Sequence, residues 1–223
     1  MNVLIACEES QRVCTEFRKL GHRAFSCDIL ECSGGHEEWH IMGDCLPLLN
    51  GNCTFITMDG KYHTITGAWD IIIAHPPCTY LTCAGNSWFN VEKYGEKAIQ
   101  RMYDREDAVN FFMKFTETNC KHVAIENPVG VMSTRYRKPE QIIQPWQFGH
   151  PERKGTCLWL TGLPNLEPTE IVEPIIIKTG KRTDSLWHIE TWNLPAKERS
   201  RARSKTFPGI AEAMAKQWGS IEL

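Results

Sequence analysis

Short runs of apolar residues alternate along the chain with segments whose apolar residues recur at helical spacing. The apolar runs predict buried strands at residues 2–6, 23–29, 69–75, 122–126 and 156–160. The helical segments predict helices over residues 96–119 and 209–218, besides a first helix after Ser10. Strands that alternate with helices indicate an α/β fold with a doubly wound, mostly parallel sheet.

The first predicted helix has defined ends. Ser10 is a residue type that caps helix N-termini, and Gly21 is a type that ends helices. The spacing between them predicts that Val13, Phe17 and Leu20 share one buried face.

Polar and nucleophilic residues directly follow the predicted strands. In a doubly wound sheet, ligands bind at the carboxyl ends of the strands. The residues found there are Cys7, Glu8, Asp28, Asp44, Cys78 and Glu126. The sequence therefore predicts a functional site along this edge of the sheet.

Cys78 and Glu126 form the most informative pair. Two prolines, Pro76 and Pro77, stiffen the turn before Cys78 and hold a thiol that can attack an electrophilic ring carbon. A carboxylic acid at Glu126 can bond a pyrimidine ring nitrogen and assist that attack as a general acid. Taken singly, the two residues also fit a structural cysteine and a surface acid capping a turn.

Composition and charge narrow the class of protein. Of 223 residues, 42% are hydrophobic and 23% are charged, which is typical of a globular domain. No apolar run is long enough to span a membrane, and the N-terminus lacks the basic start of a signal peptide, so we expect a cytoplasmic protein. With a net charge of −2, a nucleic acid must be held by local basic patches.

Ten cysteines are present, and none form a CxxC pair. Without a secretory signal, they are expected to be reduced thiols. Metal-ligand residue types gather at Cys27, Cys32, His36 and His40, but their spacing matches no standard structural zinc site. We therefore expect buried thiols and surface histidines here, and no metal.

Four segments together resemble the cytosine-5 DNA methyltransferase family and occur in that family's order. Residues 69–78 resemble its nucleophile motif, residues 125–128 its Glu-Asn-Val motif, residues 148–160 its later arginine motif, and residues 207–215 its closing segment. The chain looks like a compact phage-type member with a Rossmann-like methyltransferase fold. The resemblance implies that S-adenosyl-L-methionine methylates carbon 5 of cytosine in DNA through a covalent cysteine adduct.

The resemblance assigns catalytic roles residue by residue. It implies that Cys78 attacks carbon 6 of cytosine, while Glu126 bonds ring nitrogen 3 and the amine. Asn127 belongs to the same motif as Glu126. Lys154 stands at the family's first arginine and is expected to stabilise the cytosine oxygen, because Thr156 replaces the second arginine.

Cofactor contacts are implied at the strand ends. They are Cys7, Glu8, Asp28, Ile29, Asp44, Cys45 and Pro76. Asp28 stands where the family binds the ribose hydroxyls, and Asp44 where it binds the adenine amine. The family's glycine-rich loop is replaced by residues 7–11, so Glu8 or Glu9 is expected to reach the methionine amino group.

Residues 163–205 fall where the family has a much larger target-recognition domain. The chain is thereby divided into a core at 1–162, this reduced segment, and a C-terminal helix at 206–223 that returns to the core. Basic residues expected on DNA phosphates are Arg135, Arg137, Lys181, Arg182, Arg199, Arg201 and Arg203. Trp187, His188 and Trp192 suit base stacking, although a solvated loop over core tryptophans fits the same pattern.

Two other functions stay open on the sequence. The missing glycine loop and second arginine also fit a non-catalytic module that binds nucleic acid or protein. The reduced segment also fits methylation of a free pyrimidine nucleotide. The presence of both Cys78 and Glu126 favours the enzyme.

Overall fold

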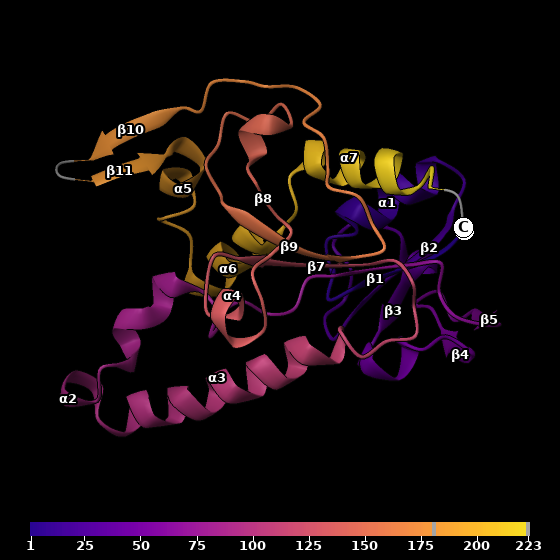
Figure 1. The fold of residues 1–223 in the computed structure, drawn as a ribbon, viewed down its shortest axis with the longest axis horizontal. Coiled ribbons are helices and arrows are strands. Elements are labelled where there is room, and N and C mark those ends of the chain that lie inside the picture. Colours follow the sequence, from indigo (N-terminus) through magenta and orange to yellow (C-terminus); the bar gives the residue numbers. More distant parts are fainter. Residues whose placement is uncertain (180–181, 222–223) are drawn as a thin grey trace.

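A seven-stranded sheet runs through the centre of the protein, which a computed structural model describes for residues 1–179 and 182–221 (Figure 1). In spatial order its strands are β3 (His40–Met42), β2 (Arg23–Asp28), β1 (Asn2–Ala6), β6 (Ile71–Ala74), β7 (Val123–Pro128), β9 (Thr156–Thr161) and β8 (Gln141–Ile143). The first five are parallel, and β9 runs antiparallel to β7 and β8. The predicted doubly wound, mostly parallel α/β sheet is confirmed.

The direction of winding reverses between β1 and β6. From β1 the chain moves outward to β2 and β3, and it then returns to place β6 and β7 on the other side of β1. Such a reversal opens a crevice at the carboxyl ends of the two central strands. The fold therefore puts the residues after β1 and β6 at the natural ligand site.

Helices cover both faces of the sheet (Figure 1). On one face, α1 (Arg12–Lys19) and α7 (Pro208–Trp218) pack over Val3 and Ile5 of β1. On the other face, α3 (Glu96–Lys114) packs its C-terminal half over Leu4 and Ile72. Successive strand residues point to opposite faces, so β1 and β6 are buried on both sides. No helix in the described ranges is long and apolar enough to cross a membrane.

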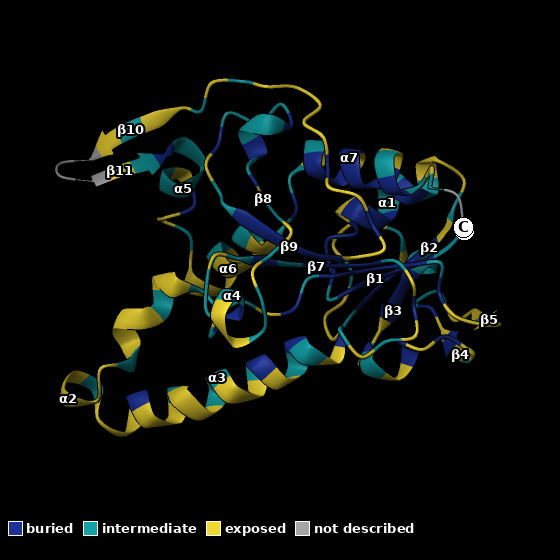
Figure 2. Cartoon of the chain, in the orientation of Figure 1, coloured by how far each residue is buried: buried dark blue, intermediate teal, exposed yellow. Residues whose placement is uncertain are grey.

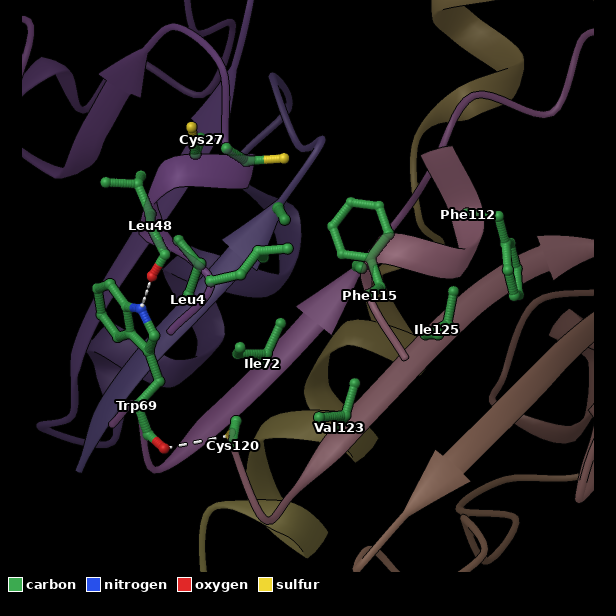
Figure 3. Close-up of a cluster of buried hydrophobic side chains, with 14 of the residues drawn as sticks. Leu4, Cys27, Leu48, Trp69, Ile72, Phe112, Phe115, Cys120, Val123 and Ile125 are labelled. Carbon is green, nitrogen blue, oxygen red and sulfur yellow. Dashed lines mark hydrogen bonds between the residues drawn. The ribbon is translucent and has the colours of Figure 1, made fainter. Parts of the chain in front are cut away.

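The core under α3 is apolar and its polar atoms are paired. Figure 3 shows Phe112 of α3 and Phe115, which directly follows α3, beside Ile125 of β7 in one cluster. The indole nitrogen of Trp69 donates to the carbonyl of Leu48 at 2.6 Å, so this buried donor is satisfied (Figure 3).

Several short elements lie outside the predicted set. The two hairpins are β4 (Cys53–Ile56) with β5 (Tyr62–Ile65), and β10 (Ile176–Thr179) with β11 (Arg182–Ser185). The further helices are α2 (Val91–Tyr94), α4 (Met132–Arg135), α5 (Leu186–Glu190) and α6 (Ala196–Ser204). The 3₁₀ helices are η1 (Glu37–Trp39), η2 (Leu46–Leu48), the longer η3 (Cys83–Phe89) and η4 (Pro145–Gln147). The hairpin β10–β11 and the helices α5 and α6 come from the segment predicted as a reduced recognition region, whose separate status stays a prediction.

The start of α1 differs from the prediction. The helix begins at Arg12, and Gln11 precedes it in the left-handed region with φ 56°, so Ser10 does not cap it. The carboxylate of Glu8 takes that role by accepting from the backbone N–H groups of Val13 at 2.7 Å and Cys14 at 3.2 Å. Leu20, predicted on the buried face, is 47% exposed because it follows the last helical residue.

The long helix α3 is shorter and less buried than predicted. It ends at Lys114 and not at residue 119. Ile99 and Met102, predicted for its apolar face, are 43% and 42% exposed. Figure 2 shows why: the N-terminal half of α3 is mostly exposed, because it extends beyond the sheet that covers the other half.

Candidate active site

A cavity of about 1070 Å³ opens at the carboxyl ends of β1, β2, β3 and β6. The predicted cofactor residues that line it are Cys7, Glu8, Asp28, Ile29, Asp44 and Cys45. Cys78, the predicted nucleophile, lines the same cavity. Pro76 is not among its lining residues, whereas the next proline, Pro77, is. Topology thus brings the predicted cofactor residues and the predicted nucleophile together, while the binding itself stays a prediction.

The turn that carries Cys78 is held at both ends. The side-chain amide of Asn127, only 2% exposed, donates to the carbonyl of Pro76 at 2.7 Å. After the turn, the carbonyl of Cys78 accepts from the backbone N–H groups of Leu81 and Thr82, each at 3.0 Å. Asn127 therefore holds the backbone of the turn that carries Cys78.

Burial raises the pKa of the Cys78 thiol, and the negative charge of Glu126 raises it further. The positive charge of Lys154 works in the opposite direction and favours the thiolate. Lys154 is itself held in place, since its Nζ donates to the carbonyl of Arg203 at 3.0 Å and lies about 6 Å from the rings of Trp187 and Phe207. Lys154 therefore offsets part of the effect that burial and Glu126 have on the pKa of Cys78.

Glu126 pairs with a histidine that the sequence interpretation missed. Nδ1 of His75 lies 2.9 Å from Oε2 of Glu126, and the two side chains are only 9% and 11% exposed. Burial favours the neutral form of each group, but their mutual attraction prevails: the pKa of His75 is raised and that of Glu126 is lowered. The sequence contained one signal for His75: it is a polar residue at the end of an apolar strand, directly before the two prolines.

Three acidic side chains line the part of the cavity that is predicted to hold the cofactor. Burial raises the pKa of Glu8 to about 7, although its two bonds to the start of α1 oppose this. Burial also raises the pKa of Asp28, which accepts from the backbone N–H of Leu30 at 2.9 Å. Asp44 accepts from the backbone of Leu46 at 3.0 Å. Asp28 and Asp44 stay predictions as the ribose and adenine contacts.

Helix α6 forms one wall of the cavity, which the sequence did not indicate. Its residues Lys197, Ser200, Arg201 and Ser204 line the space. Arg201 donates from Nε and a terminal nitrogen to the two oxygens of Glu9, at 3.1 and 3.2 Å. The loop after β1 and the segment predicted for target recognition are thus joined across the cavity.

The arginines predicted on DNA phosphates have partners inside the protein. Arg135 pairs with Glu106, and Arg137 pairs with Glu140. Arg199 donates to the carbonyl of Trp192 at 3.0 Å. Lys181 lies outside the described residues, and of Arg182 only the backbone, paired with Thr179, is described.

Arg203 is likewise engaged, because it donates to Thr191 Oγ1 at 2.8 Å and to the carbonyl of His188 at 2.9 Å. Of the three candidate stacking residues, Trp187 packs against Phe207 with ring centres 5.4 Å apart, whereas Trp192 is 47% exposed and stacks on His188. Phosphate contacts by these arginines stay a prediction. To make them, the arginines would have to give up their present partners inside the protein.

The cysteine and histidine side chains of the segment that was considered as a metal site do not come together at one point. His40 is buried, with its ring nitrogens 2.8 Å from Ser26 Oγ and 2.9 Å from the carbonyl of Leu30. Cys27 and Cys32 line the large cavity instead. Across residues 1–179 and 182–221, no three His, Cys, Asp or Glu side chains are arranged to hold a metal ion.

Comparisons with known proteins give distant structural likenesses only. No protein-family model and no curated protein matches the chain. A solved structure described as a DNA modification methyltransferase encoded within a prophage (E. coli) is 13% identical with a TM-score of 0.42, over 78% of this chain and 52% of that one. The Entamoeba histolytica methyltransferase EhMeth is 12% identical with a TM-score of 0.38, over 79% and 58%. The chain spans little more than half the length of either structure, and likenesses this distant assign no function, which has to be inferred from the site.

Proposed function

We propose that this protein is a methyltransferase that acts on carbon 5 of cytosine in DNA, with S-adenosyl-L-methionine as the methyl donor and Cys78 as a covalent nucleophile. One observation carries the proposal. Cys78 lines the strand-end cavity and lies close enough to the buried pair of Glu126 and His75 for the charge of Glu126 to act on its thiol. A thiol and an acid in that relation suit addition to a pyrimidine ring.

The residues around the cavity fit S-adenosyl-L-methionine. The cavity volume of about 1070 Å³ is at the upper end for small-molecule sites. Carboxylates at Asp28 and Asp44 offer acceptors for hydroxyl groups and an amine, and Glu8 or Glu9 offers one for an ammonium group. When bound, this cofactor supplies the methyl group.

The chain's own residues account for the other requirements of the reaction. The thiolate of Cys78, favoured by the charge of Lys154, adds to carbon 6 of the cytosine. Glu126 provides the hydrogen bond to ring nitrogen 3, where charge develops during this addition. Asn127 keeps the nucleophile turn in one conformation through Pro76. Once carbon 5 has gained the methyl group, its proton passes to solvent water, the double bond between carbons 5 and 6 re-forms, and the sulfur–carbon 6 bond breaks to release the Cys78 thiolate.

Incubation with labelled S-adenosyl-L-methionine and duplex or single-stranded DNA tests the proposal. We expect label in 5-methylcytosine, and a covalent complex with DNA containing 5-fluorocytosine, which cannot lose a proton from carbon 5. Cys78→Ala should abolish both signals. Cys83→Ala is the matched control, because Cys83 is exposed and does not line the cavity. A Cys78→Ala protein that still methylates cytosine would refute the covalent mechanism.

A second substrate is favoured by one observation. The described arginines predicted for phosphates are occupied by internal partners, which leaves fewer cations for a polymer and suits a free pyrimidine nucleotide. The same assay with a deoxycytidine nucleotide in place of DNA decides between the two. Label in the nucleotide and none in DNA would transfer the proposal to the smaller substrate.

A further inference from the structure

His75 connects the cavity, which it lines, with Glu126, which is not among the lining residues. It directly follows β6, lines the cavity that Glu8 and Asp28 also line, and bonds Glu126 at 2.9 Å. Its other ring nitrogen, Nε2, is enclosed and has no hydrogen-bond partner among the described residues. The hydrogen-bonded path from this imidazole therefore leads through Nδ1 to Glu126.

Charged groups face His75 from three directions. Glu126 approaches from β7, Glu8 from the loop after β1, and Lys154 from the segment before β9. The two carboxyl groups favour a protonated imidazole, whereas Lys154 and burial oppose it. The contact between the two groups therefore shifts the pair toward a protonated His75 beside an ionised Glu126, which together hold one proton.

Cytosine needs that proton. Its ring nitrogen 3 is a hydrogen-bond acceptor, so an ionised Glu126 cannot bond it, while a protonated Glu126 can donate to it. The thiolate of Cys78 brings a negative charge to the ring on adding to carbon 6, and a proton at nitrogen 3 neutralises that charge.

We propose that His75 is the proton store of the site: it supplies the proton that Glu126 donates to the ring, and it recovers this proton when Cys78 leaves. This inference rests on the proposed cytosine chemistry. On base binding, the Nδ1–H bond of His75 breaks and an O–H bond forms on Glu126. On addition, the O–H bond breaks, an N–H bond forms at ring nitrogen 3, and the sulfur–carbon 6 bond forms. Elimination reverses both transfers, so no proton is consumed.

The first test measures the pair without substrate. Imidazole signals of isotope-labelled protein are followed by NMR from pH 5 to pH 9, with the His75 signal assigned by its loss in His75→Gln. We expect His75 to titrate above the ordinary histidine value of 6.5, and at least about one pH unit lower in Glu126→Gln, because the buried imidazolium then lacks its partner. The signal of His36, which pairs with Glu38 at the surface, serves as the internal control.

Titration of His75 at the same pH in both proteins would overturn the proposal. If Glu126→Gln fails to fold, Glu126→Asp provides the same comparison with the charge kept and the distance lengthened. In that variant we expect the His75 titration to fall part of the way. An unchanged titration would again overturn the pair.

The second test measures delivery of the proton. The rate of adduct formation with 5-fluorocytosine DNA is recorded against pH for the wild type and His75→Asn, whose amide can bond Glu126 but cannot carry the proton. In the wild type the rate should fall as pH rises through the NMR titration of His75, because the store is then empty. In His75→Asn that limb should be absent and the rate at neutral pH reduced about tenfold or more. If the wild type is active and the fall in rate at high pH persists in His75→Asn, His75 is not the proton store, while the proposed function stands. If the wild type forms no adduct on any cytosine substrate, the proposed function and the proton delivery are both refuted.

Discussion

Glu8→Gln should change the way in which stability depends on pH. The carboxyl group of Glu8 is buried against the start of α1, and burial raises its pKa to about 7 from the ordinary value of 4.5. The folded protein therefore holds a proton at Glu8 over a pH range in which the unfolded chain has released it. Because the folded state binds more protons there, the free energy of unfolding falls as pH rises from about 4.5 through about 7.

The size of the effect follows from the two pKa values. The difference between about 7 and 4.5, at about 1.4 kcal/mol per pH unit, corresponds to about 3 to 4 kcal/mol of stability lost between acid pH and pH 8. Part of this acts through His75, since the negative charge of Glu8 raises the pKa of that histidine. Glutamine has no such titration, although it costs stability at every pH because only one of its terminal atoms accepts hydrogen bonds from α1.

Urea unfolding followed by tryptophan fluorescence at pH 5, 6, 7 and 8 measures the effect. The quantity that matters is the free energy of unfolding of the wild type minus that of Glu8→Gln, which we expect to fall by about 2 to 3 kcal/mol between pH 5 and pH 8. Glu117→Gln, which removes an exposed carboxylate at the end of α3, is the control. A wild-type-minus-variant difference that stays constant with pH would show that Glu8 is ionised throughout, and the account of its burial would be wrong.

Three further variants test other parts of the site. Asp28→Ala should weaken binding of S-adenosyl-L-methionine about 10- to 100-fold in calorimetry, because charge-assisted hydrogen bonds contribute about 1.5–3 kcal/mol; an unchanged dissociation constant removes Asp28 from the cofactor site. Asn127→Ala should lower kcat while leaving cofactor affinity close to wild type, because it frees the carbonyl of Pro76, and a normal kcat would contradict the positioning role. Arg203→Ala should lower the free energy of unfolding by about 1–2 kcal/mol, whereas exposed Arg153→Ala should not; a stable Arg203 variant with weakened DNA binding would restore the phosphate role.

The central strands were predictable because burial on both faces leaves a continuous apolar run. β1 and β6 have such runs, and their carboxyl ends had to share one edge once a parallel sheet was inferred. That is why Asp28 and Cys78 could be assigned to one site before their contacts were known. β3 and β8, of three residues each, are too short to show a period, and they were missed.

The pairings inside the site depend on contacts between distant parts of the chain. His75 and Glu126 lie 51 positions apart, and Glu9 and Arg201 lie 192 apart. Nothing in the local pattern distinguishes a basic residue that binds phosphate from one that binds a buried carboxylate. Arg201 was therefore predicted to bind DNA. Its contact with Glu9 can be recognised only in the three-dimensional structure.

The contact of α6 with the cavity limits how the protein can diversify. Residues 163–205 cannot be exchanged as an independent cassette, because Lys197, Ser200 and Arg201 would leave with them and remove a wall of the cavity. A graft from another protein would have to reproduce the bond to Glu9 as well as its own target contacts. Single substitutions at exposed positions outside the cavity lining, such as Trp192, leave this wall in place, whereas recombination at the segment boundaries removes it.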